Sequence, residues 1–393
     1  MNRITHRHGP LSTLAITAYL LISPYPSAAT PFFMGLGNLG GNSVALGVSG
    51  NSSTVVGVSG TGSGQEAFRW TESTGMVGLG HLPSGGLNSV AYGVSADGSV
   101  VVGQDIYSNA APVSREAFRW TQGTGMVGLG DLPGAEFASG AYGVSADGSV
   151  VVGGGRTEVT TAEAFRWTEA TGMVGLGHLP GVSGVNLVSE AQAVSADGSV
   201  VVGQSLNASH EFEAFRWTES GGMVGLGYVP GGGDISSAQD VSADGSVVVG
   251  YSWLSPSGSG REAFRWSEGT GIIGLGDLPG GSFNSQAYAV SGNGSVVVGE
   301  GYTDSGPEAF IWDATNGMRS LRDVLIIDYG LDLSGWTLTA VRDISADGRT
   351  LVGQGSGGAW IARLDATQVP EPGTLLLLCS GFVAFRLTMR RWR

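Results

Sequence analysis

One ten-residue stretch, Val-Ser-Ala-Asp-Gly-Ser-Val-Val-Val-Gly, constrains the fold more than any other feature of the chain, because it recurs without change. The identical copies begin at Val94, Val144, Val194 and Val241. Looser versions begin at Val48, Val290 and Ile344. A unit that recurs at a fixed period predicts an array of equivalent structural modules that pack side by side.

Two other motifs recur with the same period. The motif Glu-Ala-Phe-Arg-Trp, or a weaker form of it, ends at Trp70, Trp120, Trp167, Trp217, Trp266, Trp312 and Trp360. These tryptophans are 46 to 50 residues apart, and a Gly-Met-Val-Gly motif or a variant of it follows most of them. A period of this length with Trp and Gly markers predicts a propeller blade of four strands.

The second repeat shows how such a blade is expected to form. Its four strands are expected at residues 91–95, 99–103, 116–121 and 125–132. Asp97 and Gly98 form the first hairpin turn, because aspartate caps a turn and glycine accepts a positive φ angle. Phe118 and Trp120 lie on one face of the third strand, which we expect to pack between blades.

The two ends of the repeat region are incomplete in complementary ways. The last repeat ends after its third strand, at residues 360–364, and residues 32–39 read as a fourth strand without the first three. We therefore expect an all-β fold, a seven-bladed β-propeller of four-stranded blades, with the ring closed by the N-terminal strand. An open β-solenoid, the alternative, would not require matching ends. Residues 321–336 interrupt the pattern, and residues 320–328 are expected to form a short helix against the last blade.

The chain termini differ from the repeat domain, residues 30–366. Residues 1–29 combine a basic start, a short apolar run and small residues, which is typical of a secretory signal peptide, with a buried helix as the alternative. Residues 367–393 combine a Pro-Glu-Pro triplet, eleven apolar residues and a basic end. Because a stable span needs about 20 apolar residues, we expect transient membrane contact, with a plain membrane anchor as the alternative.

Charge and cysteine content exclude several functions. Without its termini the chain has 13 arginines, no lysine and 32 acidic residues, so its net charge is about −19. Nucleic acid is not an expected partner, because binding phosphates needs clustered basic residues. The single cysteine, Cys379, lies in the tail, so the exported domain has neither a disulfide nor a thiol nucleophile.

From about residue 32 to residue 364 the chain resembles the HAF-repeat family of extracellular proteins. The shared motifs are Leu-Gly-x-Leu-Pro-Gly-Gly, Ser-x-Ala-x-x-Val-Ser-x-Asp-Gly and Val-Val-Gly. Glutamate replaces the histidine of the family's His-Ala-Phe triplet in six repeats. The resemblance implies an extracellular location, and the family carries no established activity.

The C-terminal tail resembles a PEP-CTERM sorting signal. The residues that carry this resemblance are Pro370, Glu371, Pro372, Arg390 and Arg391. The resemblance implies that an exosortase processes the chain in a Gram-negative bacterium that makes exopolysaccharide. It also implies a cell-surface or extracellular location, with a membrane tether before the tail is processed.

The sequence contains no catalytic motif, and we predict no catalytic residue and no cofactor. Asp97 and its equivalents could bind calcium, but one carboxylate per turn is too few for about six to eight oxygen ligands, so we expect turn capping. His81 and His178 occupy a position that holds Asp, Asn or Tyr in other repeats, which is typical of a tolerant surface site. Glu66 and Arg69 point to opposite faces of a strand, and we expect a salt bridge to a neighbouring blade.

Sequence diversity is concentrated on one rim of the predicted ring. The links between second and third strands and between blades share that rim and vary freely, whereas the hairpin turns of the other rim hardly change. Scaffolds usually carry function on such variable loops. The aromatic residues there, which we predict to stack on a sugar ligand, are Tyr107, Phe137, Phe212, Tyr251, Trp253, Phe283 and Tyr302. The alternative is that each ring only anchors its own loop.

We therefore expect an exported, non-enzymatic binding or structural module of the cell surface or extracellular matrix. Its expected partner is exopolysaccharide or another surface protein. The alternative is a glycan hydrolase or lyase, which needs two carboxyl groups about 5–10 Å apart in one pocket. The acidic residues available for it are Asp105, Glu136, Glu158, Glu190, Asp234 and Asp304. A purely structural spacer is the third possibility.

Overall fold

The computed structural model describes residues 30–83, 85–86, 88–108, 114–134, 138–158, 160–255 and 260–364. Several predictions lie outside these ranges: the signal peptide, the loop residues Glu136 and Phe137, and the sorting residues Pro370, Glu371, Pro372, Arg390 and Arg391. Residues Thr30–Thr367 form one compact unit. Within the described ranges, no helix is both long and apolar enough to cross a membrane.

The described residues form an all-β fold of five sheets, three of which have four antiparallel strands. One sheet contains, in order, β1 (Phe32–Gly35), β28 (Gly358–Arg363), β27 (Thr350–Gly355) and β26 (Leu338–Ile344). A second contains β18 (Ser236–Val241), β19 (Val247–Trp253), β20 (Arg261–Ser267) and β21 (Gly271–Gly274). A third contains β22 (Gln286–Val290), β23 (Val296–Thr303), β24 (Gly306–Asp313) and β25 (Gly317–Ser320).

The other two sheets have eight strands, and each consists of two antiparallel halves. In one of these sheets, the first half contains β2 (Ser43–Val48), β3 (Val55–Gly60), β4 (Gln65–Thr71) and β5 (Gly75–Gly78). Its second half contains β6 (Asn88–Val94), β7 (Val100–Ser108), β8 (Ser114–Thr121) and β9 (Gly125–Gly128). In the other sheet, the first half contains β10 (Gly140–Val144), β11 (Val150–Gly155), β12 (Thr160–Thr168) and β13 (Gly172–Gly175). Its second half contains β14 (Leu187–Val194), β15 (Val200–Leu206), β16 (Phe212–Thr218) and β17 (Gly222–Gly227). Short parallel pairings of β4 with β6 and of β12 with β14 join the halves.

The N-terminal strand β1 belongs to the same sheet as the last three strands of the chain. It pairs antiparallel with β28, with Phe32 opposite Arg363 and Gly35 opposite Trp360. The N-terminal strand therefore completes the sheet of the last repeat, as the incomplete ends of the repeat region predict.

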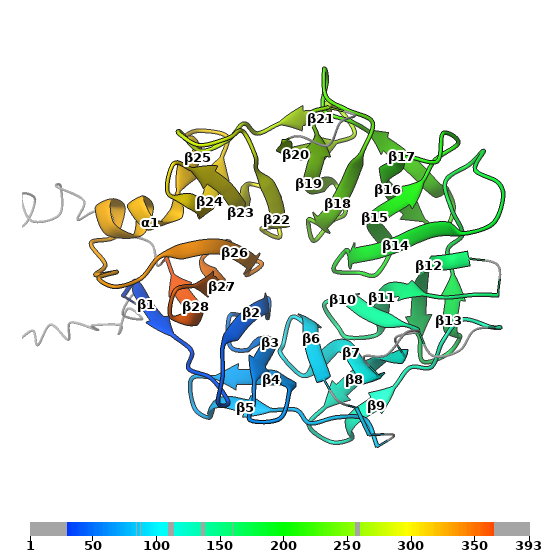
Figure 1. Ribbon diagram of the computed structural model, residues 1–393, viewed down its shortest axis with the longest axis horizontal. Helices are drawn as coiled ribbons and strands as arrows, with labels where there is room; N and C mark the ends of the chain where they lie inside the picture. The colour runs from blue at the N-terminus through cyan, green and yellow to red at the C-terminus, as the bar shows by residue number, and fades with distance from the viewer. Residues whose placement is uncertain are drawn as a thin grey trace, which may run out of the picture. The chain divides into compact units, whose positions relative to one another are not determined.

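Figure 1 shows the sheets around a common centre, with β2, β6, β10, β14, β18, β22 and β26 nearest to it. Backbone hydrogen bonds of 2.9 or 3.0 Å join successive hairpin turns, from the N–H of one turn to the carbonyl of the next. The donor and acceptor pairs are Asn51–Ala96, Ala96–Ala146, Ala146–Ala196, Ala196–Ala243, Ala243–Gly292 and Gly292–Ala346. The alanine of the repeated Ser-Ala-Asp-Gly turn therefore forms the contact between neighbouring modules.

The Val-Val-Val-Gly end of the repeat forms the second strand of each module. Val101 and Val102 in β7 are fully buried, as is Phe118 in β8, so the valines and the phenylalanine form the expected core between sheets. The glycine is required by close packing, because a Cβ atom on Gly103 would overlap the carbonyl oxygen of Val90. The equivalent glycines make the same approach at Gly57, Gly153, Gly203, Gly250, Gly299 and Gly353.

The hairpin acids cap their turns, as expected. Oδ1 of Asp147 accepts hydrogen bonds from Oγ of Ser145 at 2.7 Å and from the backbone N–H of Ser149 at 3.0 Å. These bonds lower the pKa of Asp147 to about 2, because they favour the ionised carboxylate. Within the described residues, no group of three or more acidic, histidine or cysteine side chains is placed to hold a metal ion.

The predicted salt bridge of Glu66 and Arg69 to a neighbouring blade is wrong. Oε1 of Glu66 accepts the backbone N–H of Gly80 at 2.9 Å, within the same module. Arg69 donates to Oγ1 of Thr54 at 3.1 Å and to the carbonyl of Gly98 in the next hairpin at 3.4 Å. Glu66 and Arg69 therefore contact backbone or hydroxyl groups rather than an opposite charge. Arg69 nevertheless links two modules.

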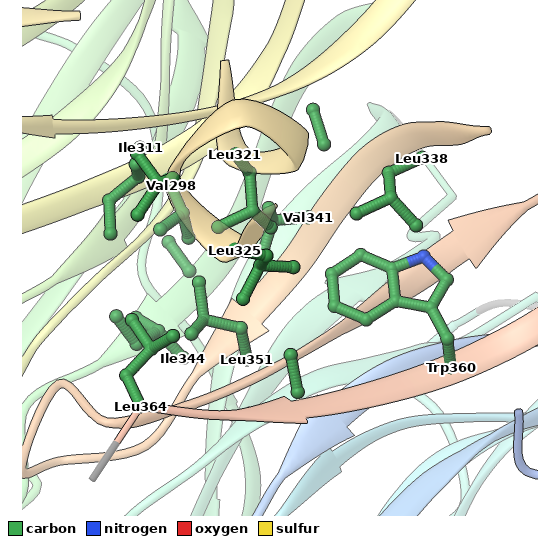
Figure 2. Close-up of a cluster of buried hydrophobic side chains, with 14 of the residues drawn as sticks. Val298, Ile311, Leu321, Leu325, Leu338, Val341, Ile344, Leu351, Trp360 and Leu364 are labelled. Atoms are coloured by element: carbon green, nitrogen blue, oxygen red, sulfur yellow. The ribbon is translucent and has the colours of Figure 1, made fainter. Parts of the chain in front are cut away.

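The fourth strands are shorter than expected, and the inserted segment is helical, as expected. Strand β9 ends at Gly128 rather than near residue 132, because Gly130 has a φ of +77° and turns the chain. The insertion forms α1 (Leu321–Asp323) and a π-helical turn, η1 (Val324–Asp328). Leu321 and Leu325 are fully buried and belong to one cluster with Trp360 (Figure 2).

Candidate functional site

A β-bulge in the innermost strand of each described module directs one extra side chain toward the centre. In β6, for example, the register with β7 shifts between Ala91 and Gly93, so that Tyr92 is the bulged residue. The bulged residues are Leu46, Tyr92, Tyr142, Gln192, Gln239, Tyr288 and Arg342. We call these seven residues the bulge ring. Bulges often re-aim side chains next to functional sites.

The same seven residues line one central cavity of about 250 Å³. The same seven residues also line an adjoining space of about 180 Å³, to whose lining Asp240 and Asp343 contribute. Pockets for drug-sized ligands usually measure roughly 300–1,000 Å³, so this cavity suits one small unit of a ligand rather than a long segment.

The hydroxyl group of Tyr92 lies toward the rim that carries the variable loops. Nε2 of Gln104 donates a hydrogen bond to the hydroxyl of Tyr92 at 3.1 Å. Gln104 pairs with Val90, which lies farther from the hairpin turn than Tyr92 does. The tyrosine side chain therefore leans away from the invariant turns, so its hydroxyl is accessible from the variable side.

Two tyrosines form an aromatic wall of the cavity. The rings of Tyr92 and Tyr142 meet edge to face, with centroids 5.4 Å apart and an interplanar angle of 79°. Burial raises the pKa of Tyr142 to about 12 and also raises the pKa of Tyr92. Both hydroxyl groups therefore stay protonated at neutral pH and can donate a hydrogen bond.

Arg342 brings a positive charge to the cavity. Its Cζ atom lies 4.4 Å from the ring centroid of Tyr288, a cation–π contact. Its Nε atom is buried and has no hydrogen-bond partner. The hydroxyl of Tyr288 lies 3.5 Å from Oε2 of Glu300, and burial raises the pKa of Glu300 although Arg342 opposes that effect. In the described ranges, no carboxylate lies within ion-pair distance of Arg342.

Two aspartates lie directly after bulged residues. Oδ2 of Asp240 accepts the backbone N–H of Val290 at 2.8 Å, and Oδ2 of Asp343 accepts that of Val48 at 2.7 Å. Both residues line the cavity and are half-buried, and the surrounding protein desolvates their carboxyl groups. This desolvation raises the pKa of Asp240 to about 7 and, with added repulsion from Asp240, that of Asp343 to about 8.

Six of the seven predicted aromatic residues are described, and they lie at different places on the scaffold. Tyr107 is half-buried against a core cluster and donates a hydrogen bond to Glu116. Phe212 is half-buried in β16, opposite Leu206. Tyr302 is half-buried in β23, opposite Pro307.

The remaining three predicted aromatic residues lie near one arginine. The Cζ atom of Arg261 is 5.4 Å from the ring centroid of Tyr251 and 5.2 Å from that of Trp253. Phe283 is 47% exposed, and its backbone approaches Gly260, the neighbour of Arg261. We call Tyr251, Trp253, Arg261 and Phe283 the aromatic patch.

The five described acids considered for a hydrolase share no cavity with the bulge ring. Asp105 is fully buried, while Glu158, Asp234 and Asp304 are exposed on three different loops. Oε2 of Glu190 accepts a hydrogen bond from Nε2 of Gln204 at 3.3 Å. None of these acids lines the central cavity.

The two strand-end histidines differ in exposure, since His81 is exposed and His178 is half-buried. Nδ1 of His81 lies 3.0 Å from Oδ1 of the buried Asp105, whose other oxygen accepts the N–H of Leu82 at 2.7 Å. Nε2 of His178 is buried and has no hydrogen-bond partner, and burial lowers the pKa of this side chain. The contact between His81 and Asp105 therefore joins two modules, which a pattern of residue types does not reveal.

Our sequence reasoning missed the bulge ring, although a signal for it is present. The residue after the buried alanine or valine of each innermost strand changes between Leu, Tyr, Gln and Arg, while a nearly constant alanine precedes it and a Val-Ser or Ile-Ser pair follows two positions later. We assigned the whole strand to the scaffold, because neighbouring side chains of a regular strand lie on opposite faces. The bulge alters that alternation.

Comparisons with known proteins identify the tail. Residues 368–391 match the PEP-CTERM protein-sorting motif. This motif is a recognition signal for exosortase processing, so the chain is an exported surface protein whose tail is anchored in the membrane before processing. No curated protein matches the chain.

Solved structures with a similar fold are distant. TolB from Acinetobacter baumannii has 15% sequence identity and a TM-score of 0.46, and the match covers 69% of this chain and 63% of that one. A chain of the mitotic checkpoint complex has 13% identity and a TM-score of 0.43, with 90% and 99% covered. The chain thus matches less than two thirds of the length of TolB, and neither similarity carries a conclusion about function.

Proposed function

We propose that this protein is a non-enzymatic glycan-binding module of the cell surface, built as a closed seven-bladed propeller of HAF-like repeats. The sorting motif at residues 368–391 supports its place at the surface. The pairing of β1 with β28 and the hydrogen bond from Val48 to Asp343 support ring closure. A signal peptide at residues 1–29 would start its export.

The observation that carries the proposal is the convergence of the bulge ring on one cavity. Tyrosine faces can pack on the C–H surface of a sugar, while tyrosine hydroxyls, glutamine amides and an arginine can bind its oxygens. Gln192 and Gln239 add donors and acceptors from two further strands. A small cavity with a few convergent polar groups is the usual form of a specific ligand site.

The aromatic patch is the second part of the proposed site. A polysaccharide held at the centre by one unit would leave over the rim of the variable loops, where Phe283 is exposed. The cation–π contacts of Arg261 hold the rings of Tyr251 and Trp253 in place. We propose that the patch binds the chain of the ligand, while the bulge ring binds a single unit of it.

The proposal is non-enzymatic because the two carboxyl groups in the cavity are occupied. Oδ1 of Asp240 accepts the N–H of Val241 at 2.8 Å, and Oδ1 of Asp343 accepts the N–H of Ile344 at 2.7 Å. Since Oδ2 of each also accepts a backbone N–H, all four oxygens serve the scaffold. A glycosidase needs carboxyl groups that face its substrate.

The test measures binding of the full-length chain, in mild detergent, to exopolysaccharide from producing cells, with and without calcium. New reducing or unsaturated sugar ends are assayed in parallel. We expect saturable binding without cleavage, and at least tenfold weaker binding for Tyr142→Ala or Gln192→Ala. Val185→Ala, at an exposed loop residue outside both parts of the site, is the matched control.

Each other result has a defined meaning. Cleavage would show that the protein is an enzyme. A requirement for calcium would show that the turn aspartates act as calcium ligands. Loss of binding in Phe283→Ala alone, with Tyr142→Ala unaffected, would place the site on the aromatic patch. Absence of both binding and cleavage would leave a structural or protein-binding module.

A further inference from the structure

We propose that the central cavity selects a sugar unit that carries an anionic group, and that Arg342 binds this group. The inference rests on the proposed function, since it names the class of glycan that the bulge ring takes. It starts from one contrast within the ring. Six of its members are apolar, aromatic or amide side chains, and Arg342 is the one with a permanent charge.

Arg342 is held in place without an ion pair to any carboxylate of the described residues. The ring of Tyr288 supports its guanidinium group at 4.4 Å, which fixes the position of the group. Its Nε atom is buried and unpartnered, and a buried donor without a partner costs free energy that a bound acceptor would recover. A fixed guanidinium group binds carboxylate or sulfate oxygens through parallel hydrogen bonds.

Other cations add to the positive potential at the cavity. Arg115 acts on the hydroxyl groups of Tyr92 and Tyr142, where it lowers each pKa against the larger effect of burial. Arg261 acts in the same way on Tyr288. Arg342 lines the cavity, and Arg115 and Arg261, from two other modules, act electrostatically on its tyrosines, in a domain whose net charge is strongly negative.

Four acidic residues line the cavity or act on its side chains. They are Asp240, Asp343, Glu190 and Glu300. Burial raises the pKa of Asp240 to about 7 and that of Asp343 to about 8, so both carboxyl groups are mostly protonated at pH 6.5. Burial also raises the pKa of Glu300. Both oxygens of Asp240 and of Asp343 also accept backbone N–H groups, which disperses their charge.

The test uses three sets of soluble oligosaccharides of equal length: oligouronates, sulfated dextran oligomers and neutral dextran oligomers. Binding to the full-length chain is measured by calorimetry at pH 6.5. We expect one or both anionic sets to bind at least tenfold more tightly than the neutral set, and higher salt to reduce this preference. The uronate and sulfate sets show which anionic group is recognised.

Arg342→Gln tests the residue itself. We expect it to lose at least tenfold in affinity for the anionic set while affinity for the neutral set changes less than twofold. Arg349→Gln is the matched control, because this arginine belongs to the same repeat and is exposed in the hairpin turn on the opposite rim. The melting temperature of each variant shows whether the scaffold is intact.

The outcomes separate this inference from the proposed function. Equal binding of neutral and anionic sets by the unmodified chain would overturn the selectivity and leave glycan binding in place. Equal losses for both sets in Arg342→Gln would show that Arg342 supports the site rather than selects charge. Failure of all three sets and of the exopolysaccharide would overturn both proposals.

Discussion

Oδ2 of Asp343 accepts a hydrogen bond from the backbone N–H of Val48 at 2.7 Å, although 295 residues separate the two along the chain. The bond joins β26, the last innermost strand, to β2, the first. It lies directly after the bulged Arg342 and thus next to the central cavity. The same side chain therefore connects the two ends of the repeat region and shapes the proposed binding site.

The first prediction is that the protein loses stability as pH rises from about 4 to about 8. Aspartate in an unfolded chain has a pKa of about 3.9. Folding raises the pKa to about 7 for Asp240 and about 8 for Asp343. Between these values the folded state binds more protons than the unfolded state, so the free energy of unfolding falls as pH increases and levels off above about 8. Urea denaturation at several pH values measures this slope.

The control for this slope is Asp343→Asn, whose amide does not titrate. We expect a shallower decline with pH, together with lower stability at pH 5, because one amide oxygen cannot accept both backbone N–H groups that Asp343 now accepts. An unchanged slope in the double variant with Asp240→Asn would show that other groups cause the pH dependence.

The second prediction concerns the glycine that ends each valine-rich strand. We expect Gly203→Ala to destabilise the fold by more than about 2 kcal/mol, because a Cβ atom there overlaps the carbonyl oxygen of Glu190 and forces the backbone apart. Thermal denaturation measures the loss. Gly123→Ala is the control, since a Cβ atom there meets no atom within 4 Å, and its effect is expected within about 0.5 kcal/mol. Similar melting temperatures for the two variants would refute the packing argument.

The third prediction concerns the hairpin caps. Asp147→Ala removes the acceptor of two hydroxyl groups and one backbone N–H, and we expect a loss of about 1 kcal/mol. Asp147→Asn should be nearly neutral, because Asn293 makes the same three contacts in another hairpin. Chemical denaturation at pH 7 compares the two, and an equal loss in both would contradict capping by the side-chain oxygen.

The stability of the protein at acidic pH gives an independent check of the same hairpin cap. The lowered pKa of Asp147 means that its stabilising effect is present above about pH 4 and is lost as pH falls toward about 2. Asp147→Asn should therefore lose less stability than the unmodified chain between pH 4 and pH 2.

The fourth prediction concerns the strand that completes the last sheet. The ring of Phe33 contacts Trp336, with centroids 5.1 Å apart, and Trp360, at 5.9 Å. We expect Phe33→Ala to cost about 2 kcal/mol and to increase proteolysis at the N-terminal strand. Met34 is 42% exposed, so Met34→Ala should have little effect. Equal protease resistance of both variants would argue against a role for this strand in holding the two ends together.

The sequence by itself determined the module and its boundaries. The repeated Ser-Ala-Asp-Gly turn, the valine-rich strand and the buried Phe118 follow from local rules, because turn capping, β-propensity and alternating burial act over a few neighbouring residues. The match between residues 32–39 and the incomplete last repeat likewise predicted that β1 would pair with β28.

Only the tertiary structure decided which residues face the centre. Leu46 and Arg342 are nearly 300 positions apart, and they meet at one cavity because each lies on a bulge of an innermost strand. A bulge depends on how two strands pair, which the residues of one strand do not specify. The predicted aromatic residues were chosen by loop position alone, so the contacts of Trp253 with Arg261 and of Tyr107 with Glu116 could emerge only once the strands were packed.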